Sequence, residues 1–170
     1  RKLERPGTER LMVTAFRDGQ VTARALRREA GYTESWTDDA RVQGVTAGDV
    51  VVHGLDGFAG AVGTAEVDGV CSPVYHVAVP TDGGDSHFYG RLLRVLATSG
   101  YLGLFASSTR ERAVDFRNWD LFGRIPIPHV DVASQRRIGE RIRRLAPLRA
   151  ATDRSAELVR EHKQALITAA

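Results

Sequence analysis

The last third of the chain predicts a long helix that follows a proline-bounded exit from a folded domain. The exit is Ile125-Pro126-Ile127-Pro128, where the prolines enforce an extended backbone. Ser134 is the expected N-cap of the helix, which then continues to the C-terminus. An unbroken helix over 134–170 would span about 55 Å at the α-helical rise. Pro147 lies inside this run and predicts a kink or a two-piece helix. This segment indicates a domain that leads into an extended spacer.

Apolar side chains recur along this helix at nearly heptad spacing, and we call them the apolar stripe. A stripe this narrow is typical of a helix that pairs with another helix. The chain supplies no second helix of matching length, so we expect the partner to be another chain or another half of the same parent. The opposite face is rich in arginine: contact with phosphates and ordinary solvation both remain open for it. The members of the stripe are Ile138, Ile142, Leu145, Leu148, Val159 and Leu166.

The first half of the chain predicts short strands separated by turns. Strands are expected at 11–16, 50–53, 61–67 and 74–79, whereas 21–40 is polar and predicted to be irregular. Asp68-Gly69 is a hairpin signal between two of these strands. Glycines at every third position from Gly54 to Gly63 favour tight bends over a helix. Together these patterns predict a curved, mostly antiparallel sheet.

The pattern becomes helical after residue 86. Apolar residues between 87 and 106 recur at helical spacing and are interrupted at Gly100, which predicts two helices or one broken helix packed on the sheet. A polar loop is expected over 107–120 and a final strand over 121–127. The predicted fold class is α+β, with a β-rich recognition domain over 1–130 and a coiled-coil-type spacer or dimerisation helix over 131–170.

Composition sets the broad class of the protein. The chain has 170 residues, and its 42% apolar content can fill a core, which argues against intrinsic disorder. Cys71 is the single cysteine, so an internal disulfide and a thiolate metal cluster are excluded. The sequence contains no membrane-length apolar run and no secretory signal, and a cytoplasmic protein is expected. Because it begins at Arg1 rather than methionine, we expect a processed or excised piece, or one whose start is missing.

The kind of positive charge is more informative than its sum. The net charge is only +3, but of the 24 basic residues all except Lys2 and Lys163 are arginine. A guanidinium presents a planar fork of donors that fits phosphate oxygens and the O6/N7 edge of guanine. A GC-rich genome, which favours arginine codons, explains the same bias equally well. Composition therefore permits nucleic-acid binding without establishing it.

Patterns typical of catalytic sites are missing from the sequence. The five histidines are scattered, and no two have the spacing of metal ligands, so no metal site is predicted. The glycine-rich stretch 54–60 lacks the ends of a P-loop and the spacing of a dinucleotide fingerprint. A nucleophile elbow, an activated thiol and the signature of an adenine methyltransferase are also missing. We therefore predict no catalytic residues and no cofactor.

Two arginine-rich regions are the candidate DNA-binding residues. One runs from residue 107 to 118, where hydroxyl groups suit phosphates and Arg or Asn can bond base edges. Trp119 and Phe116 beside it are expected to pack into the core. The other region precedes Tyr32. For both regions an ordinary solvated surface is the alternative. The candidates are Arg24, Arg27, Arg28, Ser108, Arg110, Arg112, Arg117 and Asn118.

Several short motifs occur in an order that resembles the specificity subunit of Type I restriction-modification systems. The resemblance covers about 13–170. Singly the motifs are weak, but their order and spacing are fairly specific. The chain departs from the family at His129-Val130-Asp131 and at Pro147, which puts the straightness of the helix in doubt. The motifs are Asp18-Gly19-x-Val21, Gly48-Asp49-Val50-Val51, Gly60-Ala61-Val62-Gly63, Ser72-Pro73-x-Tyr75, Arg117-x-Trp119, Ile125-Pro126-Ile127-Pro128, Gln135-Arg136-x-Ile138 and Glu161-x-Lys163-Gln164-Ala165-Leu166-Ile167.

The resemblance implies a half-subunit, with one target-recognition domain and one spacer helix. It implies binding of double-stranded DNA in a complex with methyltransferase subunits, which bind S-adenosylmethionine and methylate adenine, and with a restriction or translocase subunit. A homodimer through the C-terminal helix would restore two recognition domains, each reading half of a bipartite target. Base-reading residues vary within the family and cannot be carried over. Two alternatives stay open: a non-DNA protein-interaction module with a coiled-coil arm, and an enzyme whose site the sequence does not reveal.

Overall fold

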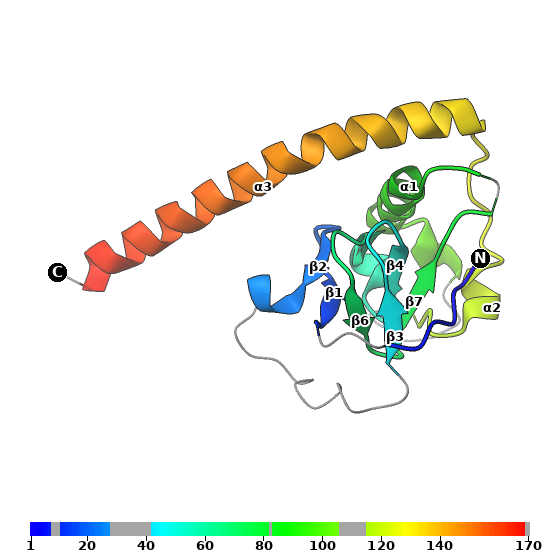
Figure 1. The fold of residues 1–170 in the computed structure, drawn as a ribbon, viewed down its shortest axis with the longest axis horizontal. Helices are drawn as coiled ribbons and strands as arrows, with labels where there is room; N and C mark the ends of the chain where they lie inside the picture. The colour runs from blue at the N-terminus through cyan, green and yellow to red at the C-terminus, as the bar shows by residue number, and fades with distance from the viewer. Residues whose placement is uncertain (8–10, 28–41, 82, 106–114, 169–170) are drawn as a thin grey trace.

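The computed structural model describes residues 1–7, 11–27, 42–81, 83–105 and 115–168 of the chain. Short strands form the lower layer in Figure 1, helix α1 (Ser86–Thr98) covers them, and the long helix α3 (Val132–Thr168) crosses over α1 and extends away from the domain. The α+β class with antiparallel sheets is confirmed. Helix α3 therefore packs on α1, and α1 packs on the strands.

Three small antiparallel sheets take the place of the single curved sheet predicted. Strand β1 (Val13–Ala15) pairs with β2 (Val21–Ala23), and β3 (Gln43–Val45) pairs with β6 (Gly69–Cys71). The third sheet has the order β5-β4-β7, from Val62–Thr64, Val50–His53 and Tyr75–Ala78. Parallel bridges connect the sheets, between Met12 and Val70 and between Val21 and Ala65. The strands are too short to form one continuous ladder.

The N-terminal segment closes this arrangement of strands. Residues 1–7 run between β7 and β3, with bridges from Lys2 to Ala78 and from Pro6 to Gln43. The Leu3 N–H donates to the Val77 carbonyl at 2.7 Å, and the Gly44 N–H donates to the Arg5 carbonyl at 2.8 Å. Edge strands that find partners in this way are protected from pairing with another molecule.

Several predictions about the first half were wrong in detail. Residues 21–23 form β2, because Val21 and its neighbours are fully buried and pair with β1. Asp68-Gly69 does not close a hairpin between paired strands, since β6 pairs with the distant β3. Among the glycines, Gly57 begins a turn of 3-10 helix, Gly57–Ala59, which ends at the left-handed Gly60 (φ 96°). Hydrophobic periodicity marks buried segments but does not say which strands pair.

The helical region beyond residue 86 matches its prediction more closely. Helix α1 ends near Gly100, whose φ is +83°, and the 3-10 segment Leu102–Phe105 follows. The predicted final strand over 121–127 was wrong, because residues Trp119–Phe122 form the short helix α2. The Asn118 side chain accepts hydrogen bonds from the N–H groups of Asp120 and Leu121 and so caps α2. The aromatic pattern of this segment therefore belongs to a helical turn.

Helix α3 begins earlier than predicted and is not broken. It starts at Val132, and the Asp131 carboxylate accepts from the Ser134 N–H at 2.9 Å, so Asp131 occupies the capping place predicted for Ser134. Helical structure continues through Pro147, and Figure 1 shows a gentle curve along the helix. Proline removes one backbone hydrogen bond from a helix and favours bending there. The two-piece helix predicted from Pro147 was therefore wrong.

The imidazole of His76 is a polar group within the buried core. Its Nε2 lies 2.6 Å from the Phe116 carbonyl, the ring packs against Trp119 and Phe122, and its Nδ1 is buried with no hydrogen-bond partner in the described part of the chain. Burial lowers the pKa of His76 below its usual 6.5. The neutral ring is therefore the form that fits the core. Phe116 and Trp119 also pack in this core, as predicted.

The buried His76 predicts a loss of stability in mild acid. Below pH 6.5 the unfolded chain binds a proton that the folded chain resists, so the free energy of unfolding falls until the pH reaches the folded-state pKa. The slope should not exceed about 1.4 kcal/mol per pH unit from this group. Urea unfolding between pH 7.5 and 5 would measure it. The decline should persist in a His53→Gln/His87→Gln double variant, because burial also lowers the pKa of these two histidines and their removal leaves His76 as the source; a flat profile would contradict the assignment.

Candidate functional site

Two of the predicted DNA-binding residues, Arg24 and Arg27, follow strand β2. Arg24 begins the 3-10 turn Arg24–Leu26, and Arg27 ends it. The Arg27 guanidinium makes an ion pair with Asp18 at 2.8 Å and lies 4.3 Å from the centre of the Phe16 ring. Arg27 therefore also helps to hold the β1–β2 hairpin in place.

Arg117 and Asn118 precede helix α2, and each has a local structural partner. Arg117 forms a close ion pair with Asp115 at 2.5 Å, which lowers the pKa of that carboxyl to about 2 and raises the pKa of the guanidinium. The Asn118 amide oxygen caps α2, as described above. The ion pair is exposed to solvent, so a phosphate could exchange with Asp115 at modest cost. Asn118 would have to give up its cap to bond adenine through both its amide oxygen and its amide nitrogen.

Strand β7 begins at Tyr75, and interactions around this residue extend toward both groups. Tyr75 stacks edge-on against His53 at 4.5 Å, and the Gly54 carbonyl beside His53 accepts from the Phe116 N–H at 2.7 Å. Burial raises the pKa of Tyr75 to about 12, and the charge of Arg24 acts against that rise. The remaining candidates lie outside the described residues: Arg28, Ser108, Arg110 and Arg112.

The most complete polar arrangement in the structure joins the domain to α3, and sequence reasoning missed it. Its centre is Asp85, which is 9% exposed and caps α1 by accepting from the N–H groups of His87 and Phe88. The same carboxylate accepts from the Arg143 guanidinium of α3 at 2.6 Å. Burial alone would raise the pKa of Asp85, but these donors hold it below its ordinary range. One carboxylate thus stabilises two helices.

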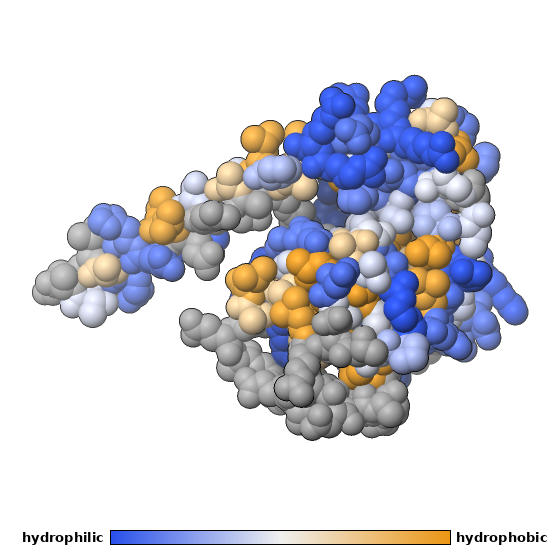
Figure 2. All heavy atoms as spheres, viewed as in Figure 1, coloured by the Kyte–Doolittle hydropathy of each residue, from blue (hydrophilic) through white to orange (hydrophobic). Residues whose placement is uncertain are grey.

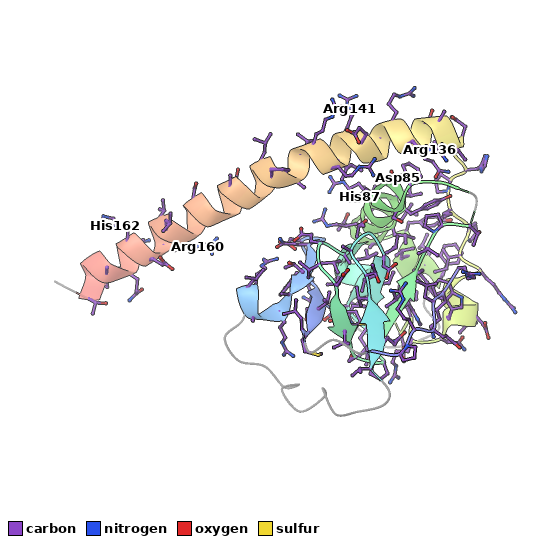
Figure 3. The ribbon with its side chains drawn as sticks, in the orientation of Figure 1. Asp85, His87, Arg136, Arg141, Arg160 and His162 are labelled. Atoms are coloured by element: carbon purple, nitrogen blue, oxygen red, sulfur yellow. The ribbon has the colours of Figure 1, made fainter. Side chains whose placement is uncertain are left out.

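Three residues of α3 complete this arrangement: Gln135, Gly139 and Arg143, which are spaced four apart. We call these three residues together with Asp85 the spacer junction. Residues at this spacing share one face of a helix. Gln135 is 1% exposed and donates to the Val130 carbonyl at 2.8 Å. A Cβ built on Gly139 would overlap the Asp85 carboxylate. Figure 3 shows Asp85 and His87 between α1 and the overlying α3.

The sequence predicts one of the two roles of Asp85 in the spacer junction. An Asp directly before the helical pattern at residue 86 is an N-cap signal. The second role of Asp85 depends on Arg143, which is 58 residues away. Nothing local to either residue predicts that contact, because it arises only when α3 packs across α1.

The apolar stripe leaves the domain and becomes exposed along α3. Ile138 is 39% exposed and Ile142 is half-buried, whereas Leu145, Leu148 and Val159 are 60%, 63% and 68% exposed. The side chain of Leu166 is not among those that the structure describes. Leu158 and Ile167, which the heptad pattern did not include, are each 60% exposed. These side chains leave an exposed apolar surface along the projecting part of α3.

The arginine-rich face of α3 lies over the end that contacts the domain, and several of its members have partners. Arg136 donates to the Gly83 carbonyl at 2.9 Å, and Glu140 makes ion pairs with Arg143 and Arg144. Figure 2 shows the strongly hydrophilic surface over this part of α3 and the apolar patches along the projecting part. The face helps to fix α3 on the domain and leaves its outer arginines accessible to an anion.

Within the described ranges, no cluster of three metal-ligating side chains occurs and no helix is long and apolar enough to cross a membrane. Cys71 is buried, and burial raises the pKa of its thiol to about 12, so it does not resemble a catalytic thiolate. Comparisons of the chain with family models, with curated proteins and with solved structures gave no match.

Proposed function

We propose that this protein recognises a specific sequence in double-stranded DNA as the non-catalytic specificity component of a Type I restriction-modification complex. The observation that carries the proposal is a β-rich domain joined firmly to a 37-residue helix that projects with exposed apolar residues. This arrangement agrees with the domain and spacer that the resemblance implies. Methylation of adenine would belong to partner methyltransferase subunits, and cleavage to a restriction subunit.

The proposed mechanism separates reading from spacing. The candidate arginines of residues 24–28 and 107–118 would contact the duplex, through phosphates for affinity and through base edges for sequence. Helix α3 would pair antiparallel with the same helix of a second copy and hold two domains apart. The projecting part after Ala146 has 22 residues and is about 33 Å long. That length is close to one turn of duplex, so the proposed target is two short blocks with a gap.

DNA binding tests the proposal directly. Arg110→Ala or Arg112→Ala is expected to cost about 1–3 kcal/mol and to relax preference at one base pair if the side chain reads a base. If it contacts phosphate only, affinity should fall equally for all sequences and the salt dependence should become shallower. Arg124→Ala, an exposed arginine outside both regions, is the matched control. Salt-independent binding, or none, would contradict the proposal.

One observation favours a second function, a protein-interaction module that does not bind DNA. Of the described candidates, Arg27, Arg117 and Asn118 all have intramolecular partners that account for their presence. Methylated adenines mapped in cells that carry the chain with its methyltransferase partner would distinguish the two functions. A bipartite methylated sequence that changes when residues 107–118 are exchanged supports DNA recognition.

A further inference from the structure

His53, at the end of strand β4, has its imidazole ring held in one orientation. The ring Nδ1 accepts hydrogen bonds from the backbone N–H groups of Leu55 and Asp56, at 3.1 and 3.0 Å. The ring also packs edge-on against Tyr75, with 4.5 Å between the ring centres. Two bonds to the backbone and a contact with a buried aromatic ring leave the imidazole little freedom to rotate. The direction in which His53 points is therefore set by the fold and not by a ligand.

The same two hydrogen bonds fix the protonation state of the His53 ring. A nitrogen that accepts from two N–H groups carries no proton, so the proton of the neutral ring is on Nε2. Burial lowers the pKa of His53 below its usual 6.5; the charge of Asp56 acts against this shift and the charge of Arg17 adds to it. Within the described ranges the Nε2–H has no hydrogen-bond partner, and it is not buried. His53 therefore presents one neutral donor at the surface.

Two exposed arginines lie close to this donor. Arg17 pairs with Asp56 at 2.8 Å, and its side chain is 67% exposed. Arg117 packs beside Gly54, where an added Cβ would lie 3.0 Å from the Arg117 Cγ, and its side chain is 59% exposed. Exposed ion pairs contribute little to stability, so each guanidinium can exchange its carboxylate for a phosphate at modest cost. The surface around His53 thus combines groups that bind phosphate with a neutral donor, as an interface that anchors and reads DNA requires.

We propose that His53 reads the edge of a guanine in the major groove, with its Nε2–H donating to N7 or O6, while Arg17 and Arg117 contact neighbouring phosphates. This inference rests on the proposed function and names a reading residue for it. Guanine presents two acceptors side by side, which suits a group that can donate but not accept. Cytosine presents an amino donor instead, which opposes the Nε2–H. The base pair that His53 reads should therefore favour guanine and disfavour cytosine at one position.

Two substitutions separate the roles of the two ring nitrogens. His53→Asn places an amide oxygen where Nδ1 lies, so it can accept from the same backbone N–H groups, but it has no group in the place of Nε2. His53→Gln places an amide N–H near the position of Nε2 and gives up the acceptor at Nδ1. The Asn variant should therefore keep the free energy of unfolding and lose the base preference. The Gln variant should lose stability and keep more of the base preference.

The probe is a duplex that the unsubstituted protein selects from a random-sequence library. His53→Asn should bind this duplex about three- to tenfold more weakly, as expected for one lost hydrogen bond, and the preference for guanine should relax at one position. Because the ring is neutral, the salt dependence of binding should stay the same, whereas Arg17→Ala should make it shallower. His129→Asn, at an exposed histidine between α2 and α3, is the matched control. Full base preference in His53→Asn, or an equal loss for every sequence, would overturn the inference.

Nitrogen NMR of the unsubstituted protein tests the inference without any substitution. In the free protein the ring nitrogens of His53 should report the neutral Nε2–H form, and the selected duplex should slow the exchange of this proton with water. A proton that exchanges equally fast in the complex would overturn the inference and leave the proposed function standing. A protein that selects no sequence from the library would contradict the proposed function, and the inference with it.

Discussion

Replacement of Gly139 by alanine is expected to destabilise the protein by about 1–3 kcal/mol, although the same change in an isolated helix would stabilise it by about 1 kcal/mol. The new Cβ would overlap the Asp85 carboxylate. Asp85 would then have to move away from Arg143 and from the N–H groups at the start of α1. Loss of a helix cap costs about 0.5–2 kcal/mol, and loss of a hydrogen bond to a charged group about 1.5–3 kcal/mol.

Urea unfolding measures this effect, and two further variants identify its cause. Gly103→Ala is the matched control, because a Cβ at Gly103 meets nothing within 4 Å. Asp85→Asn keeps a capping side chain and removes only the charge that pairs with Arg143, so it should cost less than Gly139→Ala. Amide hydrogen exchange should also become faster in the first turns of α3. A stabilised Gly139→Ala protein would show that α3 is not held at the spacer junction.

Replacement of Val159 by glutamate is expected to raise the dissociation constant of the proposed dimer by about two to four orders of magnitude. Val159 is 68% exposed in the single chain, so the folded monomer should tolerate the change. In a symmetric pair the substitution occurs twice, and each buried valine contributes about 1.5–3 kcal/mol. Every 1.4 kcal/mol corresponds to a tenfold change in the constant.

Sedimentation equilibrium measures the dissociation constants of the unsubstituted protein and of the Val159→Glu variant. Ala165→Glu adds the same charge in the same region of α3 at an exposed position outside the apolar stripe, and it should leave association nearly unchanged. Equal effects of the two substitutions would indicate that charge, not the apolar stripe, controls association. If neither substitution has an effect on a stable dimer, the pairing surface lies elsewhere on the molecule.

The sequence by itself was sufficient for the features that depend on local periodicity. The helix interrupted at Gly100 and the long helix at the C-terminus follow from the spacing of apolar residues and from turn residues within a few positions. The burial of Phe116 and the packing of Trp119 follow from their size and apolarity. These features depend on neighbours along the chain, so the sequence carries the information directly.

Only the tertiary structure revealed what depends on distant contacts. The pairing of β3 with β6 joins residues about 26 positions apart, and short strands carry too little pattern to specify such a partner. The helical turn of α2 and the unbroken path of α3 through Pro147 depend on capping and packing that override local preference. The spacer junction joins Asp85 to Arg143 because α3 lies across α1, and this contact depends on two segments that are far apart in the sequence.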